Sequence, residues 1–350
     1  MRILPNHENL TYCGRIDWDN PEAPVFIYPC SSVQMRFTGN TLKLYIRNRN
    51  VYWNNYLGYF LDGTQGVLQL AKEGDTVFEI RVDTPDEIHE FLLFKRQDAC
   101  HEFAFLGAEI GECEKIVNPL PQPNRRIEVY GDSVSAGEVS EAVSCVGKAD
   151  PPHNGEYSNS WYSYAWILAR TLNAQLHDIA QGGIALMDKT GWFCEPKAVG
   201  MEHVWDKIHY NPMLGAATKW DFSQYQPHVV IAAFGQNDSH PFDYMAQDEN
   251  GARAAEWKAH YKKFLRNLRK TYPGAVIICC TTLLDHDSAW DSAIGQAVRE
   301  MADERITQYL FRRNGSATPG HLRIPEAQEM ADELAAYIET LDIQEWNKAE

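Results

Sequence analysis

The chain has 350 residues, more than one domain usually contains, and its 48 acidic and 32 basic side chains give a formal net charge of −16. We therefore expect two domains, each with a sizeable core. The acidic balance argues against nucleic acid or an anionic membrane surface as a partner, because both are bound through clustered Lys and Arg.

The N-terminal residues 1–9 lack the apolar region of a signal peptide, and no later run of about 18 apolar residues could span a bilayer. We expect a cytoplasmic protein, provided that no leader has been removed. The 8 cysteines fit this expectation, since Cys279 and Cys280 are adjacent in an apolar run and the others show no paired spacing. None lies in the Cys-x-x-Cys pair that structural zinc sites need. We interpret them as reduced thiols, most of them buried.

Residues 1 to about 117 consist of short runs in which apolar and polar residues alternate, with turns at 38–40, 62–63 and 73–75 between them. Alternation places one side of each strand in a core, so the pattern is typical of an antiparallel sandwich. Eight such strands favour a jelly roll. The predicted strands cover residues 25–28, 33–37, 41–46, 56–61, 67–70, 76–82, 89–95 and 103–110.

Three prolines then follow within five positions, at Pro119, Pro121 and Pro123. Proline fixes φ and disfavours helix in the residue before it, so this stretch is expected to be an extended connector. We place the domain boundary here. The predicted organisation is a β-sandwich domain at 1–118, a connector at 119–125 and a second domain at 126–350.

Beyond the connector, strands alternate with longer amphipathic helices, which is the pattern of a parallel sheet covered on both faces. In such sheets the site lies at the carboxyl ends of the strands. Two long irregular stretches, 138–159 and 191–225, follow the first two strands, and loops of this length are usually functional or disordered. The predicted strands are 126–130, 175–179, 228–234, 275–281 and 306–311, and the predicted helices are 160–173, 257–268, 294–301 and 325–341.

The first strand of this domain ends abruptly in Gly131, Asp132 and Ser133. A serine at the tip of such a turn stands clear of its own backbone and can attack a carbonyl carbon, provided that a base takes its proton. Alone, the three residues are more typical of a loop whose Asp or Ser caps the next helix. The functional interpretation therefore needs further residues.

Those residues follow later strands and precede the last helix. Ser133, Gly183, Asn237 and His321 occur in the order of the four sequence blocks of the SGNH (GDSL-type) hydrolases, and the second domain resembles that family. The resemblance implies a three-layer α/β domain with a flavodoxin-like parallel sheet. Each residue alone also has an ordinary explanation as a turn or helix-end residue, but their joint order, spacing and placement at strand ends favour catalysis.

The chemistry of each part can be stated separately. Ser133 is the expected nucleophile, and His321 is the expected base that takes its proton and returns it to the leaving alcohol. The backbone N–H groups of Ser133 and Gly183 and the side-chain amide of Asn237 are expected to form the oxyanion hole. A glycine at 183 leaves room for close approach, and an amide is a donor that does not compete for the proton.

One position departs from the family pattern. The His of this family usually lies in Asp-x-x-His, whose Asp orients the imidazole, but here Thr318 occupies the Asp position. We therefore expect a Ser-His dyad in which a backbone carbonyl holds the His321 ring, or a carboxylate supplied from elsewhere. Asp285 and Asp287 are candidates for that carboxylate, although solvated loop charges are the more ordinary interpretation of both.

The order of the two domains resembles carbohydrate esterase family 2, whose members remove acetyl groups from xylan, mannan and related sugars. This implies an O-acetyl esterase that acts on acetylated oligosaccharides through an acetyl-enzyme, without a metal or organic cofactor. Trp192 and Trp290 are candidate substrate contacts, because aromatic rings near strand ends can stack on a pyranose. Asp132, beside the nucleophile, is a third candidate. The alternatives are another short-chain esterase or a thioesterase of the same fold, and a catalytically silent carbohydrate-binding protein.

Overall fold

The computed structural model describes residues 1–82, 84 and 87–346, which form two compact units. The first unit comprises residues 1–122, 153–156 and 208–218, and the second comprises 123–152, 157–207 and the chain from 219 onward. The prediction assumed two continuous domains, so the two inserted segments are a difference. Hydrogen bonds to distant parts of the first unit hold both segments, since Asn54 N–H donates to Asn154 O (3.1 Å) and Asn211 Nδ2 donates to Ala99 O (2.7 Å).

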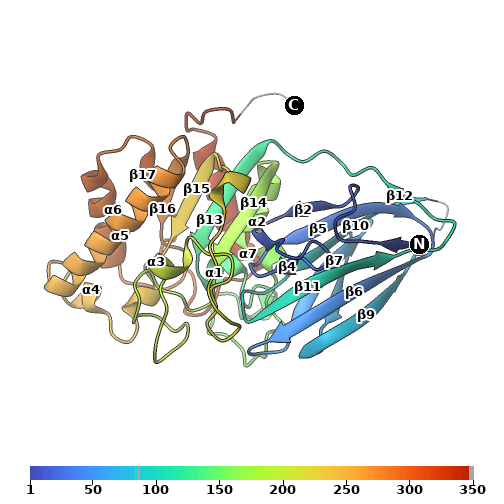
Figure 1. Ribbon diagram of the computed structural model, residues 1–350. Helices are drawn as coiled ribbons and strands as arrows, with labels where there is room; N and C mark the ends of the chain where they lie inside the picture. Colours follow the sequence, from blue (N-terminus) through green and yellow to red (C-terminus); the bar gives the residue numbers. More distant parts are fainter. Residues whose placement is uncertain (83, 85–86, 347–350) are drawn as a thin grey trace. The chain divides into compact units, whose positions relative to one another are not determined.

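The first unit contains two antiparallel sheets, each with six described strands (Figure 1). One has the order β3-β4-β11-β6-β9 with β1 paired to β11, and the other has the order β12-β5-β10-β7-β8 with β2 paired to β5. Each of the eight predicted strands corresponds to one of β4 to β11. The strands are β1 (Arg2–Ile3), β2 (Thr11–Cys13), β3 (Ile16–Asp17), β4 (Val25–Phe26), β5 (Ser32–Thr38), β6 (Thr41–Asn50), β7 (Tyr56–Leu61), β8 (Thr64–Gln69), β9 (Glu73–Arg81), β10 (Ile88–Lys95), β11 (His101–Glu109) and β12 (Ile116–Val117).

The core of the first unit is built from the apolar positions of both sheets. On β6, Leu42, Leu44 and Ile46 are all buried while the residues between them are partly exposed. They belong to one cluster with Val33 and Leu93 of the other sheet. Burial of each such side chain is worth about 1.5–3 kcal/mol, so the period-two pattern read from the sequence supplies the main stabilisation of this unit.

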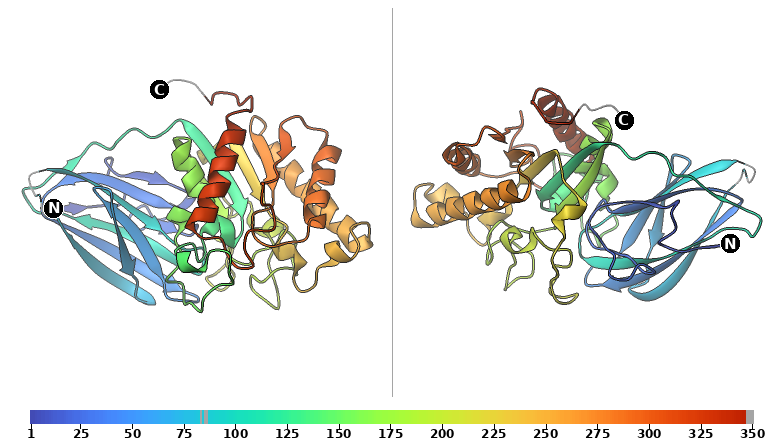
Figure 2. Two further views of the ribbon diagram at one scale, coloured as in Figure 1. Left: turned by 180° about the vertical axis from the view of Figure 1, so that it is seen from behind. Right: turned by 45° about the horizontal axis from the view of Figure 1, so that its top comes forward.

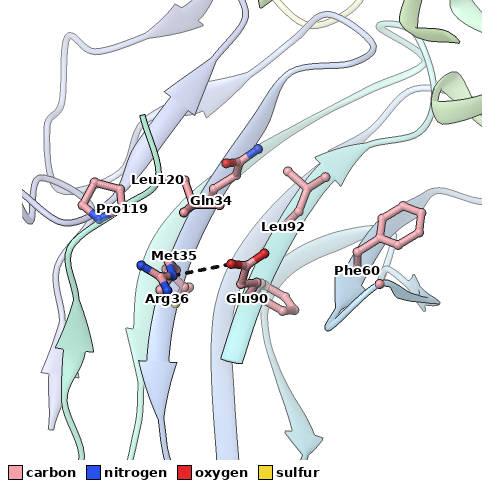
Figure 3. Close-up of a pocket in the computed structure, with 10 residues that line it drawn as sticks. Gln34, Met35, Arg36, Phe60, Glu90, Leu92, Pro119 and Leu120 are labelled. Carbon is pink, nitrogen blue, oxygen red and sulfur yellow. Dashed lines mark ion pairs between the residues drawn. The ribbon is translucent and has the colours of Figure 1, made fainter. Parts of the chain in front are cut away.

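The connector begins beside the second of these sheets. Pro119 and Leu120 line a shallow pocket of ≈ 220 Å³ together with Gln34 of β5 and Leu92 of β10 (Figure 3). An ion pair of 3.6 Å between Arg36 Nε and Glu90 Oε1 crosses the same face. Because the Glu90 side chain is more than half exposed, this pair adds little stability.

The second unit is built on a parallel sheet of five described strands in the order β14-β13-β15-β16-β17. Helix α2 packs against α7 and α5 packs against α6, on opposite faces of the sheet (Figures 1 and 2). The predicted strand 306–311 is shorter than expected, since β17 ends at Gln308. The elements are β13 (Arg125–Gly131), β14 (Ala174–Ala180), β15 (Val229–Ala233), β16 (Val276–Cys280), β17 (Ile306–Gln308), α1 (Ser133–Ala136), α2 (Tyr164–Thr171), α3 (Met201–Val204), α4 (Tyr244–Gln247), α5 (Ala252–Thr271), α6 (Ala289–Met301), α7 (Ile324–Ile338) and the 3₁₀ turns η1 (Val143–Cys145), η2 (Ser160–Tyr162), η3 (Phe222–Gln224) and η4 (Asn237–Ser239).

The carboxyl ends of the three neighbouring strands meet at one edge of this sheet. Gly131 of β13 pairs with Ala180 of β14, and Tyr130 pairs with Ala232 of β15. The segments that follow these strands are those that carry Ser133, Gly183 and Asn237 in the sequence, so the sheet brings them together.

All 8 cysteines are free thiols. Within the described part of the chain, no helix has both the length and the apolar character needed to cross a bilayer.

Candidate active site

Ser133 is the first residue of α1, and the residue before it caps that helix. The Asp132 carboxylate accepts the Val134 N–H at 3.0 Å, so the capping role that the motif also allowed is present. Among the described residues, neither the Ser133 N–H nor its hydroxyl group has a hydrogen-bond partner. The turn therefore leaves both a serine hydroxyl group and a backbone donor unused by the described residues.

Gly183 supplies a second unused donor. Its φ of +71° lies in the left-handed region that favours glycine, and a Cβ there would lie 2.8 Å from the Trp192 Cβ. The Gly183 carbonyl accepts the N–H groups of Trp192 (2.8 Å) and Phe193 (3.2 Å), whereas its own N–H has no partner among the described residues. This turn requires glycine and leaves its amide available.

Asn237 is engaged with its neighbours. Its Nδ2 donates to Asp132 Oδ2 at 3.2 Å and to the Ile184 carbonyl at 3.1 Å. The next residue, Asp238, accepts the N–H groups of Leu186 (2.9 Å) and Met187 (3.4 Å). Burial raises the pKa of Asp238 to about 7. These bonds fix the loop that carries Gly183, a role for Asp238 that sequence reasoning missed.

Asp132 is part of the framework of the site. The residue is 1% exposed, and Gln236 Nε2 donates to its Oδ2 at 2.6 Å in addition to the bonds described above. Burial raises its pKa to about 6, although the hydrogen bonds it accepts act in the opposite direction. The hypothesis that Asp132 contacts substrate was therefore wrong, because its carboxylate is buried and already bonded within the protein.

His321 has a carboxylate partner that the sequence analysis did not identify. Its Nδ1 lies 2.6 Å from Asp150 Oδ2, and its backbone N–H donates to Asp150 Oδ1 at 2.9 Å. The buried Arg323 guanidinium donates to Oδ1 at 2.8 Å. Burial opposes the charge on Asp150, but His321 and Arg323 lower its pKa well below the usual range. The imidazole is thus held by an ionised carboxylate, and the predicted dyad is corrected.

The local sequence explains why Asp150 reaches the ring. Thr318 donates its hydroxyl to the Lys148 carbonyl at 3.1 Å, which ties the loop of Asp150 to the loop of His321. At Gly320 a Cβ would lie 2.5 Å from Asp150 Oδ1, so any side chain there would displace the carboxylate.

The two carboxylates considered from the sequence have other roles. Asp287 accepts the Ala289 N–H at the start of α6 (2.9 Å) through its carboxylate. Asp285 binds Thr318 O only through its backbone N–H (3.1 Å).

The other imidazole nitrogen of His321 faces a second carboxylate. Nε2 lies 3.9 Å from Glu138 Oε1, which is an ion-pair distance and too long for a hydrogen bond. Glu138 N–H also donates to the Ser133 carbonyl at 2.9 Å, so this residue links the neighbourhoods of Ser133 and His321. Burial alone lowers the pKa of His321, but Glu138, Asp150 and Asp132 together raise it to about 9.

The two candidate tryptophans differ completely. Trp192, beside Gly183, is 56% exposed, and its ring stacks on His240 with centroids 3.4 Å apart. His240 Nε2 in turn lies 2.7 Å from Glu195 Oε1. Trp290 is 0% exposed and packs edge-on against Trp257 in the core. The hypothesis that Trp290 stacks on a sugar was therefore wrong, because no face of its ring is accessible.

Known proteins share this combination of blocks and architecture. Residues 129–317 match the family model of the GDSL-like lipase/acylhydrolase family. The chain belongs to this family. Residues 12–121 match the carbohydrate esterase 2 N-terminal model, and the two-part architecture is that of the family 2 carbohydrate esterases with an SGNH fold.

Three relatives illustrate the similarity. Cellulase/esterase CelE from Acetivibrio thermocellus is 28% identical over 348 residues, which are 95% of this chain but only 40% of that protein. An acetylxylan esterase/glucomannan deacetylase from Cellvibrio japonicus is 27% identical over 322 residues, covering 91% of this chain and 83% of that protein. The structure of a family two carbohydrate esterase from Clostridium thermocellum in complex with cellohexaose has a TM-score of 0.79 and 25% identity, covering 95% of this chain and 98% of the other.

Proposed function

We propose that the protein is a carbohydrate O-acetyl esterase in which Ser133 is the nucleophile, His321 the general base and Asp150 the residue that orients His321. The observation that carries this proposal is the state of the imidazole. Asp150 binds Nδ1 at 2.6 Å, while Nε2 makes no hydrogen bond to the described residues. A histidine held on one side and open on the other is arranged to accept a proton from a serine.

In the proposed reaction, Ser133 Oγ attacks the acetyl carbonyl carbon and its proton passes to His321 Nε2. The resulting oxyanion accepts the N–H groups of Ser133 and Gly183, both of which are unused in the described structure. The proton then moves from His321 to the leaving sugar oxygen, which leaves an acetyl-enzyme. Water, deprotonated by His321, releases acetate and restores the Ser133 hydroxyl.

Asn237 can join the oxyanion hole by exchanging one bond. Its contact with Asp132 is 3.2 Å, and Asp132 would keep the shorter 2.6 Å bond from Gln236 and the bond from Val134 N–H. The exchange leaves Nδ2 donating to a negatively charged oxygen, because the Asp132 carboxylate and the oxyanion are both ionised acceptors above about pH 6. We therefore retain Asn237 as the third donor.

The proposed substrate class is acetylated oligosaccharides of the xylan or mannan type. Support comes from the names of two relatives, one an acetylxylan esterase/glucomannan deacetylase and the other crystallised with cellohexaose. Trp192 adds physical support, since its exposed ring lies beside Gly183 and offers an apolar face on which a pyranose can stack.

For the first unit we propose jelly-roll topology, supported by the runs β4-β11-β6-β9 and β5-β10-β7-β8 in its two sheets.

The test compares wild type with Ser133→Ala on 4-nitrophenyl acetate and on acetylated xylan and glucomannan oligosaccharides. We expect kcat/KM to fall by roughly 10⁴-fold or more in the variant, because no other group replaces the nucleophile. Equal activity of the two proteins would overturn the serine mechanism. Faster cleavage of 4-nitrophenyl octanoate than of the acetate would instead point to another esterase of this fold, and sugar binding without hydrolysis by wild type would indicate a silent binding protein.

A further inference from the structure

Glu138 lies close to Nε2 of His321, the nitrogen that has to accept the proton of Ser133 in the proposed reaction. It directly follows Gly137, the C-terminal cap of α1, and its backbone N–H donates to the Ser133 carbonyl at 2.9 Å. Its side chain is only 12% exposed, and its Oε1 lies 3.9 Å from His321 Nε2. The short turn after the nucleophile therefore delivers a largely buried carboxylate to the reactive side of the base.

The other charged groups near the ring lie at different positions from Glu138. Asp150 binds Nδ1, and its charge is offset by Arg323, which donates to Asp150 Oδ1 and also to the His321 carbonyl. Asp132 contributes to the field at His321, but its carboxylate accepts three hydrogen bonds within the protein. Glu138 lies at an ion-pair distance from Nε2, the nitrogen that gains and loses the proton in the proposed reaction.

On the basis of the proposed esterase function, we propose that Glu138 is a positioning residue that stabilises the protonated form of His321 and so moves the activity of the enzyme to alkaline pH. Two opposing effects follow from one contact. The carboxylate favours the transition state of acylation, in which His321 carries the proton of Ser133. It also favours a resting enzyme in which His321 is already protonated and cannot accept that proton.

These effects dominate in different pH ranges. Burial of His321 lowers its pKa by favouring the neutral ring, but the surrounding carboxylates have the larger effect and raise the pKa to about 9. Below that value the protonated resting state limits the rate, and above it the stronger base gives the faster reaction. Removal of the Glu138 charge should therefore raise activity on the acidic side and lower it on the alkaline side.

The experiment measures kcat/KM for 4-nitrophenyl acetate from about pH 6 to about pH 10 in wild type and Glu138→Gln. We expect the acidic limb of the variant to move down by roughly one to two pH units, which is the usual effect of one nearby charge. We expect its alkaline plateau to fall by roughly 3- to 10-fold, because a less basic imidazole is a weaker general base. The two profiles should therefore cross.

Two further variants separate an electrostatic effect from a structural one. Asp285→Asn removes a carboxylate of the same unit whose side chain is not bonded to His321, so its profile should match wild type. Glu138→Asp keeps the charge at a greater distance and should give an intermediate limb. In the inactive Ser133→Ala background, an NMR titration of the His321 ring with and without Glu138→Gln measures the same shift without catalysis, even if Glu138→Gln turns over poorly.

An active Glu138→Gln enzyme whose acidic limb and His321 titration coincide with those of wild type would overturn the role of Glu138. The esterase proposal would survive that result, since it depends on Ser133. Conversely, Ser133→Ala activity equal to wild type would remove the esterase mechanism, whatever the titration of His321 shows.

Discussion

Each unit of the protein contains a histidine held between two carboxylates. In the second unit His321 lies between Asp150 (2.6 Å) and Glu138 (3.9 Å). In the first unit His209 lies between Glu102 and Asp17, with both ring nitrogens 2.8 Å from a carboxylate oxygen. In both cases burial lowers the pKa of the ring and the carboxylates raise it, to about 9.

His209 and His321 differ in whether the second ring nitrogen is hydrogen-bonded, and not in the pKa of the ring. His209 uses both nitrogens to join the segment 208–218 to the sandwich, so it has no free position for chemistry. His321 keeps Nε2 free of hydrogen bonds within the described residues and lies beside a serine turn with unused donors. A perturbed pKa therefore does not identify a catalytic histidine by itself, and the open nitrogen distinguishes the two.

The largest expected effect is the loss of catalysis when the open histidine is removed. We expect His321→Ala to lower kcat/KM for 4-nitrophenyl acetate by roughly 10⁴-fold or more, because no neighbouring group accepts the Ser133 proton. His209→Gln, the control in the first unit, should keep kcat within about twofold of wild type, because the bonds of His209 to Glu102 and Asp17 act on stability and not on the reaction. Comparable losses in both variants would break the distinction between the two sites.

The next effect concerns the carboxylate behind His321. We expect Asp150→Asn to lower kcat by roughly 10²- to 10⁴-fold, because an amide no longer stabilises the imidazolium or fixes its tautomer. The buried Arg323 also loses its counter-charge, so the folded state should be verified by circular dichroism before the kinetics are compared.

Asp287→Asn is the control for that experiment. Its carboxylate accepts the N–H of Ala289, the first residue of α6, and is not bonded to His321, so kcat should remain close to wild type. A large loss in Asp287→Asn with little change in Asp150→Asn would reverse the assignment of the orienting carboxylate.

Much of this site could be predicted from the sequence because its parts are local. Ser133, Gly183 and Asn237 lie two, three and four positions after the ends of β13, β14 and β15, and parallel strands bring their carboxyl ends to one edge. Trp290 was also predictable in principle. It lies on one face of α6 with Ile294 and Ala297, which is the helical spacing of a buried stripe, and all three are buried.

Asp150 could not be found in this way. It lies 171 residues before His321, in an irregular loop without periodicity, and its position depends on the Thr318 bond to Lys148 and on the space left by Gly320. The same holds for segment 208–218, whose place in the first unit depends on side-chain bonds such as that of His209 to Glu102. Contacts between two irregular segments that lie far apart in the chain leave no recognisable pattern in the sequence of either segment.

A smaller effect is expected from His209, and it concerns stability. Its pKa rises on folding from 6.5 to about 9, so it stabilises the fold fully below about pH 6.5 and loses this contribution as the pH rises through 9. We expect His209→Gln to lower the free energy of unfolding by roughly 1–3 kcal/mol at about pH 6 and by much less at about pH 10. Urea unfolding at both pH values measures the difference, and an equal loss at both would show that the charge of His209 does not contribute.

The smallest expected effect concerns Trp192, which is supported by a third histidine, His240. This histidine binds Glu195 through Nε2 and stacks its ring on that of Trp192. We expect Trp192→Ala to raise KM for acetylated oligosaccharides by roughly 5- to 10-fold, the value of one lost stacking contact. KM for 4-nitrophenyl acetate should change little, because this substrate has no sugar ring. The half-buried Trp205, whose ring stacks on Phe222 in the same unit, offers a control in Trp205→Ala. Equal changes in KM for both substrates in Trp192→Ala would mean that Trp192 supports the Gly183 turn and does not contact the sugar.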